Sequence, residues 1–288
     1  MTRIGDRLFQ TVNSGLLGLI AVATLFPLYY VFIVSFTDPA EFVRKSIVLL
    51  PEKWTLDAYR YLMLNGSFIH SVGVSAFLAV VGTACSLTVT SALAYALSRK
   101  RLKGRRLFTL LILFTILFNP GIIPNYLLVR DLGLIDSIWS LILPALSSGW
   151  YVILMRSFFD HIPTGLEEAA AIDGCNDIIA WVRIILPLSM PALAAFGLFF
   201  AVEYWNVYFN ALLYINDFHK WPIQLLLQNI LNDSAGSSLA EADPLRQPPP
   251  TQTLKMTAVV ITTLPILFVY PFLQKHFAKG VMLGSVKG

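Results

Sequence analysis

The chain contains the segment Glu168-Ala169-Ala170-Ala171-Ile172-Asp173-Gly174, followed after nine residues by Ile184-Ile185-Leu186-Pro187. The first part of this segment is polar, and the whole segment lies between long apolar runs. It combines acidic residues, a run of alanines, a glycine and a proline at defined spacing. These residue types predict two short helices joined by a tight turn, outside the apolar core of the chain.

Local helix signals support that prediction. Thr164 and Glu167 have the spacing of a capping box, which starts a helix at the next residue and contributes about 1 kcal/mol. The alanines favour helix and leave a surface of small side chains that a partner can approach closely. Gly174 permits the positive φ that ends a helix in a tight turn. Asn176, or the aspartate after it, is expected to cap the second helix, and Pro187 is expected to end it.

The composition places most of the chain in a lipid bilayer. Hydrophobic residues make up 56% of the 288 residues and charged residues 13%, with a mean hydropathy of +0.68. A soluble domain of this size carries more charge and fewer apolar residues. Apolar runs of about 20 residues are expected to be helices that cross the ~30 Å hydrocarbon core. The six such runs are about Leu16–Phe36, Ile69–Leu97, Leu107–Leu128, Ile138–Phe159, Leu188–Ile215 and Met256–Phe272.

Basic residues orient the six predicted spans. The positive-inside rule assigns the loop between the second and third spans to the cytoplasm, because this loop holds only basic charges. Alternation then places the amino terminus, the loop 162–187 and the tail 273–288 on the same side. The polar, Pro-rich loop 216–253 falls outside, and a loop of this length is functional or disordered. The basic residues of the first cytoplasmic loop are Arg99, Lys100, Arg101, Lys103, Arg105 and Arg106.

The sequence offers no metal, cofactor or nucleic-acid site. The four histidines are scattered without ligand spacing, and no G-x-x-x-x-G-K-[ST] phosphate loop is present. Any ATP and Mg used in the work of this chain are therefore expected on another polypeptide. The net charge of +4 arises from basic residues beside the spans, where membrane lipid explains them better than nucleic acid does.

The pattern E-A-A-x-x-D-G-x9-I-x-L-P resembles the cytoplasmic loop of permease subunits of binding-protein-dependent ATP-binding-cassette importers. The resemblance implies docking on two ATPase subunits, which hold ATP and Mg, and no catalytic residue in this chain. It also implies a second permease subunit, a different chain, and an extracytoplasmic solute-binding protein that delivers substrate. The residues it assigns to ATPase coupling are Glu167, Glu168, Ala169, Ala170, Asp173, Gly174, Ile184, Leu186 and Pro187.

Further tracts are similar to one branch of that family. Trp205-Asn206, Ala211-Leu212-Leu213 and the ending Phe277–Gly288 look like the smaller permease of carbohydrate importers of the maltose type. In that type the outer loop at 216–253 would reach into the binding protein. The stretches Asn119–Tyr126 and Gly133–Ser137 look most similar to a subset that handles oligosaccharides and uronic-acid polymers such as alginate. Two prolines and a glycine between residues 119 and 126 also predict a break in a helix.

Polar and aromatic residues of the third and fifth spans are candidates for the substrate pathway. An ionised Glu203 at the bilayer centre would cost about 2.5–3.5 kcal/mol, so it should face the bundle interior. Its neighbours are suited to stacking on sugar rings and bonding their hydroxyls. The alternative is that Glu203 pairs with a neighbouring helix and the aromatic residues pack, because sugar contacts in maltose-type relatives belong mainly to the larger permease. The candidates are Asn119, Asn125, Tyr126, Glu203, Tyr204, Trp205, Asn206, Tyr208 and Asn210.

These features predict an all-α membrane protein, a single domain over residues 1–288 in the bacterial cytoplasmic membrane. Gly82, Ser86 and Thr90 recur every four residues and predict a stripe for helix packing in the second span. We expect the chain to import an oligosaccharide by alternating access. The alternative from another class is an ion-coupled secondary transporter with Glu203 as the coupling carboxylate. The absence of an inverted repeat and of a second intramembrane acid weighs against it.

Overall fold

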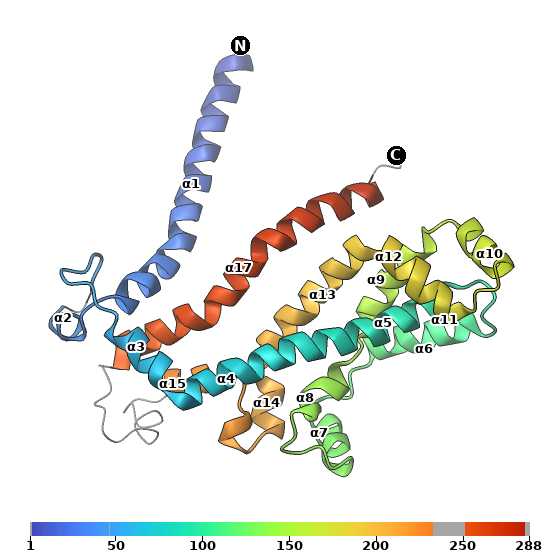
Figure 1. The fold of residues 1–288 in the computed structure, drawn as a ribbon. Helices are drawn as coiled ribbons and strands as arrows, with labels where there is room; N and C mark the ends of the chain where they lie inside the picture. The colour runs from blue at the N-terminus through green and yellow to red at the C-terminus, as the bar shows by residue number, and fades with distance from the viewer. Residues whose placement is uncertain (1, 46, 233–250, 286–288) are drawn as a thin grey trace. The chain divides into compact units, whose positions relative to one another are not determined.

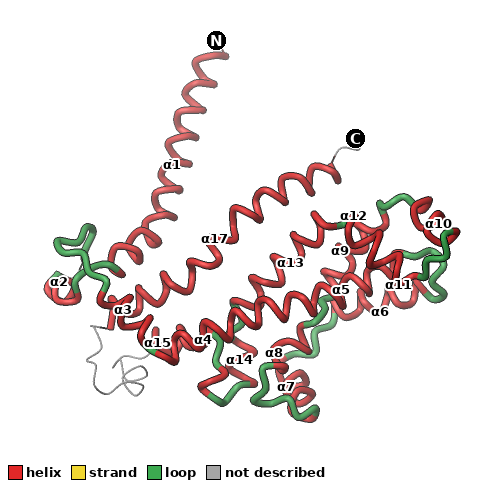
Figure 2. The backbone as a smooth tube through the Cα atoms, in the orientation of Figure 1, coloured by secondary structure: helices red, strands yellow, loops and turns green. Residues whose placement is uncertain are grey.

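The fold consists of helices. A computed structural model describes residues 2–45, 47–232 and 251–285 of the chain. In these residues no strand forms, and β pairing is limited to an isolated bridge between Thr37 and Trp54 (Figure 2). Helical structure is expected here, because a helix satisfies its backbone groups within the segment, as lipid requires.

The helices gather into two compact units, each described by itself below. One unit comprises Met1–Ile69 and Leu227–Leu264, and the other comprises His70–Leu226 and Pro265–Gly288. Three helices continue from one unit into the other: α4 (Gly66–Phe77), α15 (Ile223–Asn232) and α17 (Thr251–Ser285). The first unit also contains α1 (Thr2–Ser35), α2 (Pro39–Arg44) and α3 (Asp57–Leu64).

Polar contacts hold the first unit together where α1 ends. Asp38 accepts a hydrogen bond from the Ala40 N–H at 2.9 Å and so caps α2, which begins at Pro39. The Ser35 hydroxyl lies 2.8 Å from the Tyr59 hydroxyl on α3. The Thr257 hydroxyl of α17 donates to the Ser35 carbonyl at 3.2 Å and is buried. These bonds join three helices at the end of α1.

The second unit contains a helical bundle with shorter helices at its two ends. Helices α5, α6, α9 and α13 lie side by side, with α10 and α11 at one end and α7, α8 and α14 at the other (Figure 1). The bounds are η1, a π-helix, Leu78–Gly82; α5 Thr83–Ser98; α6 Arg105–Leu117; α7 Ile122–Asp131; α8 Trp139–Ile142; η2 Leu143–Ala145; α9 Gly149–Asp160; α10 Thr164–Ile172; α11 Asp177–Ala180; η3, a π-helix, Trp181–Ile185; α12 Leu186–Leu188; α13 Met190–Trp205; α14 Phe209–Tyr214; and η4 Phe218–Lys220.

The predicted small-residue stripe packs against α9 and α13 and is confirmed. A Cβ on Gly82 would lie 2.7 Å from the ring of Tyr204, so only glycine admits this ring. The Ser86 hydroxyl lies 2.9 Å from the Tyr204 hydroxyl, and both side chains are buried. Thr90 is also buried and donates to the Ser147 hydroxyl at 3.3 Å, in the turn before α9. Small side chains let neighbouring helices approach closely, as in other membrane bundles.

The long apolar helices agree with a membrane protein. By length and composition, Phe9–Ser35, Gly66–Ser98 and Gln252–Val269 can each cross a bilayer. Three bent helix pairs pass the same test, which gives up to six spans among the described residues. The first two of these helices start earlier than predicted, and α17 continues through the predicted tail as far as Ser285.

The predicted third and fourth spans are each two helices and not one. Helix α6 has 13 residues, about 20 Å, and α7 leaves it at 115°. The break predicted near residues 119–126 is confirmed, because Gly121 has φ +86° and its N–H bonds to the Asn119 side chain at 2.9 Å. In the fourth span, α8 and η2 meet α9 at 53°. A Cβ on Gly149 would lie 2.8 Å from Ile116, so this glycine lets α6 approach α9.

The predicted fifth span also differs from a continuous helix over 188–215. Helix α13 ends at Trp205, and α14 begins at Phe209. At the end of α13 the Val202 carbonyl accepts both the side chain of Asn206, at 2.8 Å, and its backbone N–H, at 3.0 Å. The predicted outer loop 216–253 is partly helical, because η4 and α15 lie within it. Its residues 233–250 lie outside the described part of the chain.

Candidate functional site

The segment that the sequence singled out consists of α10, a turn, α11, η3 and α12. It is named here the 164–188 hairpin. Gly174 has φ +79°, as predicted, and the Cys175 N–H bonds to the Ala170 carbonyl at 2.9 Å. This bond is the long-range closure of a Schellman motif, which a positive φ before it makes possible. Asn176 caps α11, because its side chain accepts the Ile179 N–H at 2.9 Å. The glycine turn and the asparagine cap are therefore confirmed.

Two details of the hairpin differ from expectation. Helix α10 begins at Thr164 itself, so this residue lies inside the helix and not before it. The side chains of Thr164 and Glu167 lie outside the described part, and the capping box stays a prediction. The second helix passes Pro187 and ends at Leu188. Pro187 lies near the start of the short α12, where a proline is tolerated, and α12 follows the π-helix η3, in which the Leu186 N–H bonds to the Trp181 carbonyl five residues earlier.

The hairpin has an exposed face and a buried face. Glu168, Ala169, Asp173, Gly174 and Pro187 are exposed, as a docking surface requires. Three further predicted residues are less exposed: Ala170 is buried, and Ile184 and Leu186 are half-buried. Ile185, which the sequence did not single out, is fully buried and belongs to the core of the second unit.

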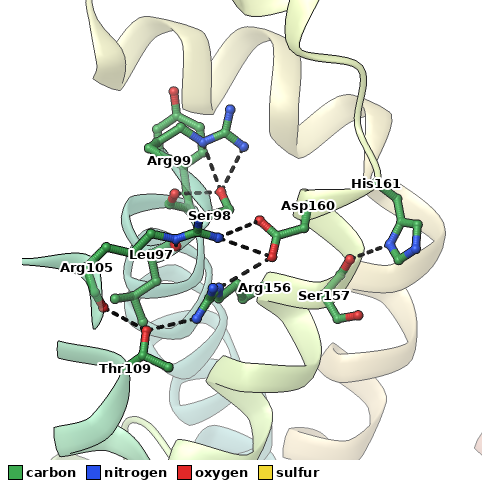
Figure 3. A network of polar contacts seen from close by, with 10 residues as sticks. Leu97, Ser98, Arg99, Arg105, Thr109, Arg156, Ser157, Asp160 and His161 are labelled. Atoms are coloured by element: carbon green, nitrogen blue, oxygen red, sulfur yellow. Dashed lines mark hydrogen bonds and ion pairs between the residues drawn. The ribbon is translucent and has the colours of Figure 1, made fainter. Parts of the chain in front are cut away.

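Arginines make ion pairs at two points, one inside the hairpin and one just before it. Arg101 forms an ion pair with Asp177, the first residue of α11. On the other side, Arg105 and Arg156 lie 3.3 and 3.4 Å from the carboxylate of Asp160, the last residue of α9 before the hairpin (Figure 3). These five residues are named the arginine clamp. The sequence assigned Arg101 and Arg105 to topology alone, so their contacts were missed.

The clamp rests on the ends of the bundle helices. Arg105 also donates from Nε to the Leu97 carbonyl at 2.7 Å, near the end of α5. Arg156 donates to the Thr109 hydroxyl of α6 at 2.9 Å. Arg99 donates to the Ser98 hydroxyl (Figure 3). Its guanidinium carbon also lies 4.6 Å from the centroid of the Tyr95 ring. Three helices therefore share the contacts that fix where the hairpin leaves the bundle.

The candidate substrate residues around Glu203 do not form one surface. Tyr204 and Trp205 are buried, with Tyr204 held by Ser86, so both side chains pack inside the bundle in this structure. Their role as sugar contacts stays a prediction. Glu203 and Asn206 are exposed on the opposite face, as residues three apart on a helix should be. Packing against the small-residue stripe decides which face turns inward.

Glu203 has a partner on the neighbouring helix. The Tyr151 hydroxyl of α9 donates to the Glu203 carboxylate at 2.6 Å, and Tyr151 packs edge-on to Phe200 at 4.8 Å between ring centroids. Three residues further on, the Asn206 side chain accepts a hydrogen bond from Gln224 at 3.1 Å. The pairing alternative for Glu203 is thus observed, and its carboxylate nevertheless stays exposed in this chain.

The other pathway candidates lie on separate elements. Asn119 lies in the break between α6 and α7, and its side chain accepts the Gly121 N–H. Tyr126 of α7 is half-buried, with its ring centroid 6.3 Å from that of Tyr214. Asn125 and Asn210 are exposed, and Tyr208 is half-buried. The structure therefore brings Glu203 and Asn206 together but leaves the 119–126 residues apart from them.

Asp136 joins the loops at the other end of the bundle from the hairpin. It has φ +61°, which aspartate tolerates better than most residues, and its carboxylate accepts the N–H groups of Asn216 and Asp217 at 3.1 and 2.9 Å. These bonds, together with a 3.4 Å contact from Lys220, hold the pKa of Asp136 below its usual value of 3.8. The sequence placed Asp136 in the 133–137 tract without a role. An aspartate soon after a glycine was the signal available for a turn.

Comparison with known proteins identifies the class of the chain. Residues 91–283, which include the 164–188 hairpin, match the family described as binding-protein-dependent transport system inner membrane component. The chain belongs to this permease family. It is a transport subunit and an all-α membrane protein of the importer-permease fold.

Relatives along the whole chain agree with this assignment. The permease is 47% identical over 285 residues to the polygalacturonan/rhamnogalacturonan transport system permease protein YtcP of Bacillus subtilis strain 168, covering 98% of this chain and 99% of that protein. It is 30% identical to the arabinooligosaccharides transport system permease protein AraQ of Halalkalibacterium halodurans, covering 93% of each.

A solved structure has the same fold. It is a crystal structure of a bacterial ABC transporter involved in the import of the acidic polysaccharide alginate, with a TM-score of 0.87 and 33% identity. The match covers 95% of this permease and 98% of that chain. The alternative of an ion-coupled secondary transporter has no support from these comparisons.

Proposed function

We propose that this permease lines the translocation pathway of an ATP-driven importer of oligosaccharides and docks on the ATPase subunits through the 164–188 hairpin. The observation that carries the proposal is the arginine clamp, which fixes an exposed hairpin to the ends of bundle helices. A docking element transmits force only if its base is firmly attached. The importer would contain a second, different permease subunit, two ATPase subunits that hold ATP and Mg, and a solute-binding protein.

The clamp explains how movement would pass from the ATPases to the pathway. Closure of the ATPase dimer displaces the exposed face with Glu168 and Asp173. Asp160, just before the hairpin, and Asp177, at the start of α11, are held by arginines and pass this displacement to α9 and to the 99–106 loop. The helices then rotate between inward- and outward-facing arrangements. The loaded binding protein favours the outward arrangement to the extent that it binds that state more tightly.

The proposed orientation places the hairpin, both termini and the 99–106 loop in the cytoplasm of a bacterium. Cys175 is a free, half-buried thiol in the hairpin, so it reports on this orientation. An impermeant thiol reagent added to intact cells should leave Cys175 unlabelled, and permeabilised cells should label it. Equal labelling in both would reverse the topology.

The proposed substrate is an oligosaccharide, with uronate-containing chains the first to test because of what the relatives named above transport. Glu203 would meet sugar hydroxyls and not carboxylates, because two anions side by side repel. Tyr151 aims the Glu203 carboxylate and leaves it exposed for such a contact. Glu203→Gln should therefore raise the substrate concentration for half-maximal transport in proteoliposomes. An unchanged value would leave Glu203 a packing residue only.

The docking proposal is tested with two substitutions in the hairpin. Gly174→Val forces a β-branched residue into φ +79°, at a cost of about 1–2 kcal/mol, and distorts the turn. Glu168→Lys leaves the turn intact and reverses an exposed charge. Both variants should lose ATPase copurification and transport, because both alter the docking face.

Gly133→Val is the matched control, because Gly133 also has positive φ, +68°, and lies beyond α7 at the other end of the bundle. The control should carry a similar backbone strain yet retain the ATPase. If Gly174→Val and Glu168→Lys copurify with the ATPase and transport normally, the hairpin is not the docking site.

A further inference from the structure

A cavity opens between the start of α6 and the end of α9. Its volume is about 260 Å³, and its walls are Arg105, Arg106, Thr109, Leu110 and Arg156. This volume is below the roughly 300–1,000 Å³ of sites for drug-sized ligands. The cavity therefore suits a headgroup or a small anion better than an oligosaccharide. Figure 3 shows three of its residues, Arg105, Thr109 and Arg156, on neighbouring helices.

The charges around the cavity favour an anion. Three guanidinium groups line it, and Asp160 is the carboxylate that pairs with two of them, Arg105 and Arg156. Arg106 is exposed and forms no ion pair with a carboxylate of the described residues. An excess of two positive charges remains, so an anion in the cavity would lower the repulsion among the arginines.

The donors in the cavity suit phosphate oxygens. The Nε of Arg156 is buried without a hydrogen bond, because its 3.4 Å contact with Asp160 is an ion pair that lacks hydrogen-bond geometry. The Arg106 guanidinium has no hydrogen-bond or ion-pair partner among the described residues. Planar guanidinium groups bind phosphate through paired, charge-assisted hydrogen bonds. Such bonds would satisfy the Arg156 donor, which has no hydrogen-bond partner in the described part of the chain.

The surface next to the cavity is apolar and points to a lipid as the source of the phosphate. Along α6, directly after the arginines, Leu107, Leu110, Leu111 and Phe114 are each more than half exposed. Basic residues at the end of a membrane helix lie at the depth of the headgroups, where basic pockets between helices bind phospholipids. The same surface gives a soluble phosphate ion no additional contact.

We propose that the cavity of Arg105, Arg106, Thr109, Leu110 and Arg156 binds the phosphate of an anionic phospholipid, whose acyl chains lie along α6. In the proposed orientation this is a lipid of the cytoplasmic leaflet. The bound headgroup would neutralise the charge beside the arginine clamp. The importer would thus carry a structural lipid next to the residues that hold its docking hairpin.

Native mass spectrometry of the purified importer complex tests the proposal, with dioleoylphosphatidylglycerol added as the probe. The informative variant is Arg106→Gln, because Arg106 lies outside the clamp and its loss should not disturb folding. Lys103→Gln is the matched control, since it removes the same charge from the same loop outside the cavity. The dissociation constant of the last lipid to leave is measured for each complex.

Arg106→Gln should raise that constant at least about tenfold, the effect of losing a charge-assisted hydrogen bond. Lys103→Gln should raise it no more than about fivefold, the effect of one basic residue near an anionic surface. Dioleoylphosphatidylcholine should not replace the probe. Equal losses in the two variants would overturn the proposal. Release of the lipid by millimolar inorganic phosphate would assign the cavity to a soluble anion and overturn it as well.

Discussion

Substitution of Asp160 by asparagine tests whether the arginine clamp transmits the movement of the docking hairpin. Asp160→Asn removes the charge that pairs with Arg105 and Arg156 but keeps the size of the side chain and one acceptor oxygen. We expect the importer to assemble, because the core of the second unit is untouched. The base of the hairpin should become loose, and the loaded binding protein should stimulate ATP hydrolysis less.

The magnitude follows from the exposure of the three side chains. Asp160 is 37% exposed, whereas Arg105 and Arg156 are 27% and 19% exposed. Exposed ion pairs contribute about 0.2–1 kcal/mol, and breaking a buried pair costs about 3–5 kcal/mol. Two partly exposed pairs at 3.3 and 3.4 Å should lie near the lower range, about 1–2 kcal/mol together. This energy shifts the equilibrium between the held and released positions by about 5–30-fold.

Hydrogen exchange measures that shift directly. Protection of the amides at the end of α9, including His161 and Ile162, should fall by about the same factor in Asp160→Asn. Asp131→Asn is the control, because Asp131 is an exposed carboxylate that pairs only with its neighbour Arg130 among the described residues. If exchange and stimulated ATP hydrolysis in Asp160→Asn equal those of Asp131→Asn, the clamp does not hold the hairpin.

Two further predictions concern packing and pH. Gly82→Ala places a Cβ 2.7 Å from the Tyr204 ring and should destabilise the complex by about 1–3 kcal/mol, whereas Gly73→Ala, with open space around it, should not lower the melting temperature. Equal melting temperatures would contradict the close packing. The lowered pKa of Asp136 means that its contacts stabilise the fold above the unfolded pKa and are lost as pH falls through the folded pKa, below 3.8. Asp136→Asn, which keeps the turn, should therefore lose less stability than the unmodified protein as the pH falls from about 5 to below 3.8. If the melting temperatures of the two proteins fall in parallel with pH, this prediction is refuted.

The parts of the fold that depend on local chemistry could be predicted from the sequence. Gly174 and Asn176 act through bonds to residues at most five positions away, so residue type and spacing predict the turn and the cap. The break near Pro120 and Gly121 was predicted for the same reason. The breaks at 146–148 and 206–208 were not predicted, because hydropathy reports how apolar a segment is and not its backbone conformation.

The contacts that attach the hairpin could not be predicted, because they join distant residues. Arg105 and Asp160 are 55 positions apart, and Arg101 and Asp177 are 76 apart. A single sequence gives no signal for such pairs, and the positive-inside rule accounts for every arginine in the loop without them. The inward position of Tyr204 was easier to predict from the sequence. A stripe of small residues on one helix leaves space that a large side chain of a neighbouring helix fills.

The corner at Ser189 gives the hairpin a mechanical property. Residues 177–188 meet α13 at 87°, and the Ser189 N–H bonds to the carbonyls of both Ile185 and Leu186 at 3.0 and 3.1 Å. A buried corner braced in this way keeps its angle while the two arms move as one piece. Because the angle is fixed, a displacement of residues 177–188 along their own axis would swing α13 sideways. If the hairpin docks on the ATPase as proposed, its displacement would tilt α13 without bending that helix.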